Sequence, residues 1–471
     1  MGQMFTIKAS EAHGRRLDPE YHHALRRTRI RSTYPSAKLW SLSYFRTGGT
    51  PSTAHPEYWN GLIPWVSAKD FKAFRFEDSE DHVTELAVAE STTCYVNRPA
   101  VLMVSRSGIL QHTLPVMVTH KPTTINQDIK AFFPDDRVSV DYLGAFFDVF
   151  GSRLLPLVCK SGATVQSLNT EQLMDLSIPL PPLSEQRKIV AELDSAYAAK
   201  RAADEKATKL LASIDDVVLN ELGIAKLPKP DTSLSSRIFT VPAKEVANAT
   251  LAPDHYFDSI DFSKAKYPCE RFVERIDIDP PCGLEQIAKL VPMESVSAEW
   301  CAIENIEDIS PDATQGYSTF RGGDVIWARI TPCMENGKSA VVEAEPSECF
   351  CGSTEFLVFR PKDDKVNPYY LQSLLHLKRF REVAAHHFTG TSGHQRVTAD
   401  YFKSISIPVP PRSVQDRIVS TVSSIRAKAR KLKADATAAL DAAKRKIEAG
   451  IVAANQITAE APAKKAAILG K

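Results

Sequence analysis

The stretch Ser177-Ile-Pro-Leu-Pro-Pro182 recurs 229 residues later as Ser406-Ile-Pro-Val-Pro-Pro411. The residues that follow each copy also recur at that offset: Ser184, Gln186, Ile189 and Val190 return as Ser413, Gln415, Ile418 and Val419. A Pro-Pro pair ends a strand, and the apolar spacing after it indicates a helix. A long internal repeat of this kind predicts two copies of one architecture in a single chain.

Further repeats lie outward from this stretch in both directions. They pair residues 5–11 with 239–245, 17–21 with 251–255, and 125–132 with 352–359. Short β-rich runs such as Ala100–Ser105 and Asp324–Ala328 occur in each half between Gly, Pro and Asn turns, which favours mixed α/β bodies. The expected fold class is therefore α/β (α+β), with two mixed bodies and two long helices.

Each expected helix carries an apolar seam with alternating spacings of four and three, which is typical of a coiled coil. The seams are Ile189, Leu193, Ala196, Ala203, Ala207, Leu210, Ile214 and Val217 in the first helix, and Ile418, Val422, Ile425, Ala429, Leu432, Ala436, Ala439 and Ala443 in the second. Matching helices in one chain are most simply paired antiparallel with each other, giving pseudo-two-fold symmetry. Ser184 and Ser413 are the expected N-caps, with Asp416 completing a box-like Ser-x-x-Asp.

These signals divide the chain into six parts. Gly223 suits the end of the first helix, and the Pro- and Ser-containing segment after it reads as a linker. The expected boundaries are a first body over 5–182, a helix over 183–222, a linker over 223–238, a second body over 239–411, a helix over 412–456 and a flexible tail over 457–471.

The bulk composition excludes some classes. The net charge of +1 over 471 residues does not by itself indicate a polyanionic partner. The sequence contains no apolar run long enough to span a bilayer and no apolar signal-peptide core, so we expect a cytoplasmic protein without a membrane. The eight cysteines include no C-x-x-C pair, and we expect reduced thiols and no metal site.

Several strings resemble one family, the specificity subunits of type I restriction-modification systems. Gly48-Gly-Thr-Pro-Ser-Thr53 with Pro56–Trp65 looks like the opening of a target-recognition domain. The strings Arg106–Leu110 with Thr124–Asp128, and Ala328–Lys338 with Gly352–Phe356, are similar to two recognition-domain variants. The string Ile178–Gln186 resembles the start of the family's conserved helix, and the resemblance extends from Phe5 to about Gly450.

The resemblance implies a non-catalytic subunit whose two recognition domains each read one half of a bipartite, asymmetric site in double-stranded DNA. The helices would set the spacing and dock two modification subunits. It implies no cofactor in this chain: the modification subunit would bind S-adenosylmethionine, and restriction (motor-nuclease) subunits, if present, would bind ATP and Mg²⁺. The sequence leaves open whether the complex restricts DNA or only methylates it.

The candidate DNA-binding residues are loop side chains beside the repeated strings, because amide and guanidinium groups pair with base edges. They are Ser105, Arg106, Asn126, Gln127, Lys130 and Gln166 in the first body, and Arg329, Glu335, Asn336, Lys338, Thr354 and Gln395 in the second. The loop Ser161–Gln166 is two residues longer than Ser392–Gln395, so the match of Gln166 with Gln395 stays open. For each residue the alternative is a structural role in a turn or a contact with a phosphate group. Trp59 and Trp65 are expected in the core.

A stand-alone methyltransferase or nuclease is the alternative from another class. Asn367-Pro-Tyr-Tyr370 is close to the Asn-Pro-Pro-Tyr motif with which amino-methyltransferases hold a flipped base. The internal repeat instead aligns it with Val140–Leu143 and predicts a helix start, with Asn367 as cap and Pro368 in the first turn. Gly337-Lys-Ser339 lacks the earlier glycine of a phosphate-binding loop.

Overall fold

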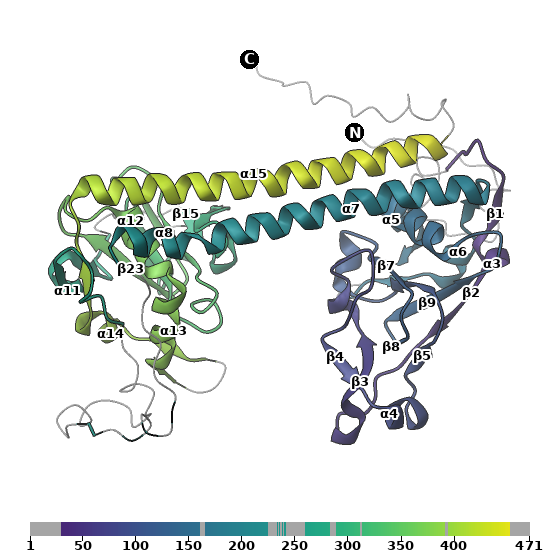
Figure 1. Cartoon of the computed structure of the whole chain (residues 1–471), viewed down its shortest axis with the longest axis horizontal. Helices are drawn as coiled ribbons and strands as arrows, with labels where there is room; N and C mark the ends of the chain where they lie inside the picture. Colours follow the sequence, from purple (N-terminus) through teal and green to yellow (C-terminus); the bar gives the residue numbers. More distant parts are fainter. Residues whose placement is uncertain are drawn as a thin grey trace, which may run out of the picture. The chain divides into compact units, whose positions relative to one another are not determined.

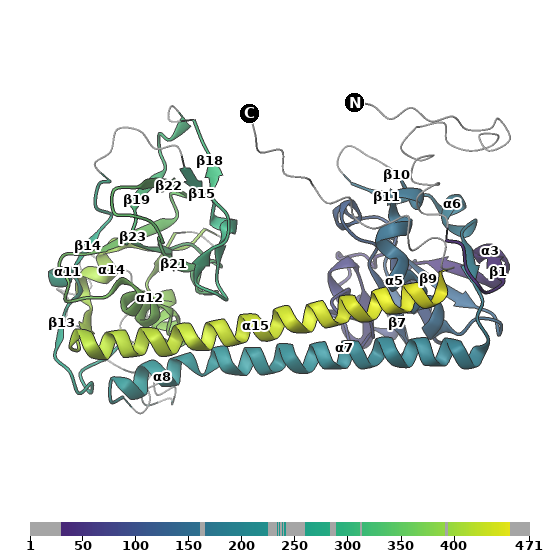
Figure 2. The ribbon, with the colours of Figure 1, turned by 90° about the horizontal axis from the view of Figure 1, so that it is seen from above.

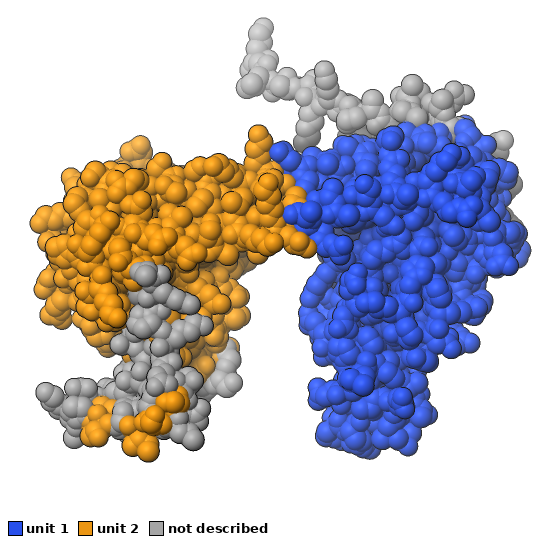
Figure 3. Space-filling view, in the orientation of Figure 1, with its two compact units in different colours: residues 1–202, 435–471 blue, residues 203–434 orange. Residues whose placement is uncertain are grey.

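The fold was described from a computed structural model of the whole chain (Figure 1). It describes residues 30–160, 165–224, 233, 235, 238, 240–241, 260–282, 289–310, 313–390 and 394–452. The predicted repeat over 5–21, the repeat over 239–255 apart from residues 240–241, most of the linker over 223–238 and the tail over 457–471 lie outside these residues. The chain divides into two compact units, unit 1 (residues 1–202 and 435–471) and unit 2 (residues 203–434), shown in Figure 3.

The first half of the chain contributes strands, short helices and the helix α5 to unit 1. Its elements are β1 (Ser36–Lys38), α3 (Leu39–Leu42), β2 (Ser43–Thr47), η1 (Pro56–Tyr58), β3 (Trp59–Val66), η2 (Ala68–Asp70), β4 (Asp81–Val83), α4 (Glu85–Glu90), β5 (Cys94–Val96), β6 (Ala100–Val104), η3 (Gly108–Gln111), β7 (Val116–Thr119), β8 (Thr123–Ile125), β9 (Ile129–Pro134), α5 (Val140–Val158), β10 (Cys159–Lys160), β11 (Ser167–Leu168), α6 (Thr170–Met174) and β12 (Ser177–Pro179).

Two helices, α7 (Leu183–Ala212) and α8 (Ile214–Glu221), lead into the second half. Its elements are β13 (Cys269–Arg271), α11 (Phe272–Arg275), β14 (Ile276–Ile278), β15 (Lys289–Val291), η4 (Met293–Ser295), β16 (Val296–Ser297), β17 (Ala302–Ile303), β18 (Glu307–Asp308), β19 (Ser318–Arg321), β20 (Val325–Ala328), β21 (Ser339–Val341), β22 (Cys349–Gly352), β23 (Phe356–Pro361), α12 (Pro368–His376), α13 (Lys378–His386), β24 (Phe388–Thr389), β25 (Arg396–Val397), α14 (Ala399–Ser404), β26 (Ser406–Pro408) and α15 (Arg412–Ile451).

Both units contain the same pair of four-stranded sheets. The inner sheet has the order β2-β9-β6-β7 in unit 1 and β14-β23-β20-β21 in unit 2. The outer sheet has the order β4-β3-β8-β5 in unit 1 and β18-β15-β22-β19 in unit 2. In each outer sheet the central pair is parallel and matches Val66 with Ile125, or Val291 with Gly352. The expected mixed α/β class is confirmed, and the offset of 227 residues holds in the strand register.

Alternation along the strands explains why each unit forms layers. In β6, Val101 and Met103 face the helical layer that contains α5, whereas Ala100, Leu102 and Val104 face the core between the two sheets. In β20, Val325 and Trp327 face helices and Ile326 faces the other sheet. Figure 1 shows the inner-sheet strands β2 and β9 nearer α7 than the outer-sheet strands β3 and β4 of unit 1. The outer sheet of unit 1 therefore lies farther from α7 than the inner sheet does.

The Pro-Pro joints are built alike in both units. Gln186 is fully buried; its side-chain amide donates to the carbonyl oxygens of Arg137 and Pro181 and accepts from the Ser139 amide. Gln415 makes the same three bonds with Lys365, Pro410 and Asn367. The hydroxyls of Tyr142 and Tyr370 bind the carbonyls of Pro179 and Pro408. Each joint thus ties a long helix to its own body.

Antiparallel contacts between the long helices occur inside each unit. In unit 1, Leu193 of α7 shares a core with Leu440 and Ile447 of α15, and Lys446 Nζ lies 2.6 Å from Glu192 Oε1. In unit 2, Arg417 of α15 pairs with Glu221 of α8 at 2.9 Å. Figures 1 and 2 show the C-terminal part of α15 beside the start of α7. The start of α7 therefore lies against the end of α15, and the start of α15 lies against α8, as the apolar seams predict.

The structure corrects several details of the helices. Both begin one residue before the predicted serine caps, and the carbonyls of Pro182 and Pro411 accept the first helical bonds. The prediction of Ser caps was wrong, because Pro182 and Pro411 take the cap position and the serines lie inside the first helical turn. Asp416 binds Arg412 and Asn367 instead of closing a box. The predicted continuous first helix is broken between α7 and α8, whereas Gly223 has the expected positive φ of 74°.

Two further predictions fail. Ala439 is exposed and the seam continues at Leu440, because helical packing follows a period of 3.6 residues and the strict alternation drifts from it. Cys282 and Cys349 form a disulfide, so the expectation of reduced thiols was wrong for this pair. They are separated by 67 residues, and such a pairing is not deducible from sequence. No helix in the described ranges combines the length and apolar character needed to cross a bilayer.

Candidate nucleic-acid interface

The inner sheet of each unit ends in a three-way backbone junction. In unit 1, the Ser105 amide donates to Asp128 O at 2.7 Å, and Leu168 donates to Ser105 O at 2.8 Å. In unit 2, the Arg329 amide donates to Glu355 O at 2.9 Å, and Val397 donates to Arg329 O at 2.9 Å. The same backbone bonds thus join the strand end, the turn before the next strand and the β10-β11 or β24-β25 hairpin.

The junction shows which residues of the two hairpins are equivalent. Gln166 O accepts from the Ser107 amide at 3.1 Å, and Gln395 O accepts from the Thr331 amide at 3.0 Å. Gln166 and Gln395 are therefore structural equivalents, a match that the sequence left open because their loops differ in length. Both side chains are partly exposed beside the junction.

The backbone equivalence separates framework from variable positions. Ser105 corresponds to Arg329, Arg106 to Ile330, Asp128 to Glu355 and Ser167 to Arg396, as the paired bridges and amides require. Arg106 and Arg329 are thus not counterparts, although both follow a strand of the inner sheet. The junction is constant and the side chains that it presents differ between the units.

Three candidates of unit 1 are engaged inside the protein. Ser105 Oγ donates to Asp128 O at 2.9 Å, and Asn126 Oδ1 accepts from the Asp128 amide at 3.0 Å. Lys130 is buried in β9 with Nζ 4.3 Å from the Phe45 ring centre, and burial lowers the pKa of its ammonium group. Ser105 and Asn126 thus hold the turn between β8 and β9, and Lys130 packs against β2, so each has a structural role.

Two candidates of unit 1 face solvent next to that turn. Arg106 is exposed one residue beyond the junction, and its backbone forms a bridge with Ser167. Gln127 is exposed and accepts a hydrogen bond from Thr50 Oγ1 at 2.7 Å, so the Gly48–Thr53 string lies beside it. Gly48 leaves no room for a side chain there, since a Cβ would lie 1.7 Å from Ile125 O. Arg106 and Gln127 together supply a cation and a planar amide at one edge.

The equivalent edge of unit 2 contains an arginine, Arg396, that the sequence analysis missed. Arg396 donates three hydrogen bonds to the Glu355 carboxylate at 2.6–3.0 Å, while Arg329 Nε lies 3.9 Å from the same carboxylate. Nε of Arg329 is buried without a hydrogen-bond partner in the described structure. Side chains 41 residues apart in sequence carry no local pattern that would have indicated this pairing.

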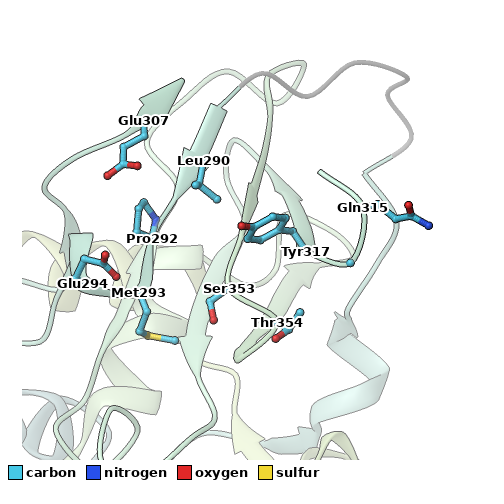
Figure 4. A pocket seen from close by; sticks show the side chains of 10 residues that line it. Leu290, Pro292, Met293, Glu294, Glu307, Gln315, Tyr317, Ser353 and Thr354 are labelled. Carbon is cyan, nitrogen blue, oxygen red and sulfur yellow. The ribbon is translucent and has the colours of Figure 1, made fainter. Parts of the chain in front are cut away.

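The other candidates of unit 2 lie on the loop between β20 and β21 or beside a surface hollow. Glu335 and Asn336 are exposed, whereas Lys338 Nζ donates to Met293 O at 2.7 Å. Thr354 is exposed and lines an open hollow together with Glu294, Glu307, Gln315, Tyr317 and Met293 (Figure 4). These side chains offer carboxylate, amide and hydroxyl groups next to apolar surface, the mixture with which proteins read base edges.

The methyltransferase-like motif has a structural use. Asn367 is the N-cap of α12: its Oδ1 accepts from the Tyr369 amide at 3.0 Å and its Nδ2 donates to Asp416. Pro368 occupies the first turn, so the predicted helix start is confirmed. The predicted alignment was one residue off, since Asn367 corresponds to the α5 cap Ser139. Trp65 is buried and Trp59 packs against the same cluster, as expected.

Comparison with known proteins identifies the family to which this chain belongs. A family model described as the type I restriction modification DNA specificity domain matches residues 35–209 and 296–440. The chain belongs to this family. The two matched segments fall in the two repeated halves, so the type I specificity domain occurs twice in this chain.

Individual relatives match a smaller part. The chain is 39% identical over 157 residues to the EcoR124I/EcoR124II specificity subunit of Escherichia coli, covering 33% of this chain and 39% of that one. It is 30% identical over 165 residues to the EcoAI specificity subunit of the same species, covering 35% and 28%. The chain thus spans well under half the length of these curated relatives. A solved chain from work on complex assembly and conformational transition of the type I R-M system shares 16% identity, covers 89% of this chain and 97% of its own length, and has a TM-score of 0.45.

Proposed function

We propose that this chain is the DNA-specificity subunit of a type I restriction-modification complex and is itself non-catalytic. Each unit reads one half of a bipartite, asymmetric site in double-stranded DNA. The chain holds no cofactor in this proposal: S-adenosylmethionine belongs to the modification subunits, and ATP and Mg²⁺ belong to restriction subunits where these join. Its place of action is the cytoplasm.

One observation supports this proposal more than any other. The two units share sheet order, joint and junction, yet they present different side chains at the junction, such as Arg106 against Ile330 and Ser167 against Arg396. A repeated framework with different exposed side chains suits a ligand that has repeated geometry but different chemistry at two places. Duplex DNA with two unlike half-sites has these properties.

The long helices support the assignment of spacing and partner docking. Each joint fixes the start of a helix to a body through a fully buried glutamine, so a body and its helix move together. In our proposal α7 and α15 set the distance between the half-sites and provide the surfaces for two modification subunits.

The test has two parts that use the full chain. Replacing residues 239–411 with the corresponding segment of another family member should change one half of the methylated sequence, read by mapping methylated adenines in cells with and without the gene. A change in both halves would refute separate reading. The purified chain alone should transfer no methyl group from S-adenosylmethionine to DNA; transfer would support the stand-alone methyltransferase instead.

A further inference from the structure

The loop from Arg329 to Lys338, here called the β20–β21 loop, combines a buried anchor with an exposed tip. Met334 is fully buried in the core of unit 2, while the next two residues, Glu335 and Asn336, are exposed. Backbone bonds from Met334 to Ile330 O, and from Asn336 to Pro332 O, coil the loop tightly. The direction of the two exposed side chains is therefore set by the backbone around them.

Two side chains from the helical layer bind the backbone of this tip. His376, the last residue of α12, places Nδ1 3.1 Å from Gly337 O. Arg381 of α13 donates from Nη1 to Glu335 O and from Nε to His376 O at 3.1 Å. The two carbonyls held in this way lie immediately before and after Asn336. Arg381 thus holds the peptide group that precedes Asn336, and His376 holds the peptide group that follows Gly337.

The chemistry of the His376 bond follows from its surroundings. Gly337 O only accepts, so Nδ1 carries the proton in this contact. Burial, together with the charges of Arg381 and Arg426, lowers the pKa of His376 to about 3, so the ring is neutral. Gly337 has a φ of 85°, and a Cβ there would lie 2.7 Å from His376 Cε1. The loop therefore approaches the ring as closely as a glycine allows.

This support is particular to unit 2. Tyr370 of α12 corresponds to Tyr142 of α5, because both hydroxyls bind the joint. Counting along the helices from these tyrosines, the equivalent of His376 is Asp148. Its carboxylate binds Tyr197 OH and Lys444 Nζ rather than a loop. The framework shared by the two units does not need the histidine, so its presence belongs to what unit 2 does differently.

We propose that His376 and Arg381 are positioning residues for base recognition by unit 2. They hold the β20–β21 loop so that Glu335 and Asn336 meet base edges in one orientation. A side chain held in one orientation discriminates between bases, whereas a mobile one adapts to several and costs ordering entropy on binding. This inference rests on the proposed function and adds to it the residues that set the specificity of one half-site.

The experiment compares the full-length wild-type chain with three variants in selection from a random duplex pool, followed by sequencing of the bound DNA. His376→Leu removes the donor and should reduce base preference at one or two positions of one half-site by on the order of tenfold. His376→Asn retains a donor at a similar place along the side chain and should keep most of the preference. Arg381→Met, which removes the bond to Glu335 O, should relax the same positions.

Controls separate positioning from folding and charge. The half-site read by unit 1 should stay unchanged in every variant, and it serves as an internal measure of an intact chain. Lys378→Met removes an equal charge from the same helix, where the side chain is 77% exposed, and should not change the motif. If His376→Leu loses both half-sites through misfolding, the comparison of Arg381→Met with Lys378→Met decides the question.

Two outcomes overturn the inference alone. The first is that stable His376→Leu and Arg381→Met chains select the wild-type motif with undiminished sharpness. The second is that His376→Asn relaxes the motif as much as His376→Leu, which would assign the effect to packing of the ring. A wild-type chain that selects no motif would instead refute the proposed function together with this inference.

Discussion

Replacing Gln415 with leucine tests the construction of the joint. The side chain is fully buried and makes three hydrogen bonds, at 2.6 Å to Lys365 O, 2.8 Å to Pro410 O and 2.8 Å from the Asn367 amide. Leucine has a similar size but leaves these groups unpaired. At roughly 1 kcal/mol for each bond, the free energy of unfolding of unit 2 should fall by about 3 kcal/mol.

Hydrogen exchange read by mass spectrometry measures this loss for each unit separately. Slowly exchanging amides of unit 2 should exchange about 100-fold faster, because each 1.4 kcal/mol corresponds to roughly a factor of ten. Gln186→Leu should have the same effect on peptides of unit 1. Gln315→Leu, at an exposed glutamine of unit 2, is the matched control and should change little. A change below about tenfold for Gln415→Leu would refute the reasoning about the joint.

Three further predictions concern reading, spacing and pH. Arg106→Ala should cost about 1–3 kcal/mol of DNA binding and relax one base pair of one half-site if the contact is bidentate to guanine, whereas an equal loss on all sequences in the selection assay would indicate a phosphate contact. Four residues inserted after Ala207, with four more after Lys431 on the facing stretch of α15, lengthen both helices by about 6 Å, and methylome mapping should then show the same half-sites one or two base pairs farther apart. The original spacing with full activity would show that the helices do not set the distance between the half-sites. The folded chain keeps His376 neutral down to a pKa of about 3, whereas the imidazole of the unfolded chain is protonated below about 6.5, so the free energy of unfolding of unit 2 should fall by up to about 1.4 kcal/mol for each pH unit below 6.5. In urea unfolding between pH 7 and pH 5, His376→Asn should lose this pH dependence, and an unchanged pH dependence would contradict the prediction.

The sequence predicted those features that repeat or have a period. The repeated Pro-Pro stretches located both joints, and the offset of 227 residues placed Ile125 and Gly352 at equivalent register positions. The predicted serine caps failed because the prolines two residues earlier take the cap position. The Cys282–Cys349 disulfide and the Arg396–Glu355 pair depend on which distant strands are neighbours, and no local pattern carries that information.

The sequence predicted which loops lie near the junctions, but not the contacts of their side chains. The loops chosen from the sequence do lie beside the inner-sheet junctions, since they follow strand ends in both halves. Which side chains are available there depends on tertiary contacts: Lys130 packs over Phe45 and Lys338 binds Met293 O, although both are cations in the expected strings. Whether the twelve candidate residues contact DNA stays a prediction.

Unit 1 is formed from both ends of the chain, which affects the order in which the units fold on the ribosome. Unit 2 is a continuous segment, whereas the core of unit 1 includes Leu440, Ile447 and Ile451 from the end of α15. Ser32 Oγ also binds Ile451 O at 2.8 Å, near the start of the described chain. The earlier-made unit therefore cannot complete its core until the last helix has emerged. A chain that stops near residue 434 leaves that core open, so truncated products are marked for proteolysis by the apolar surface that they expose.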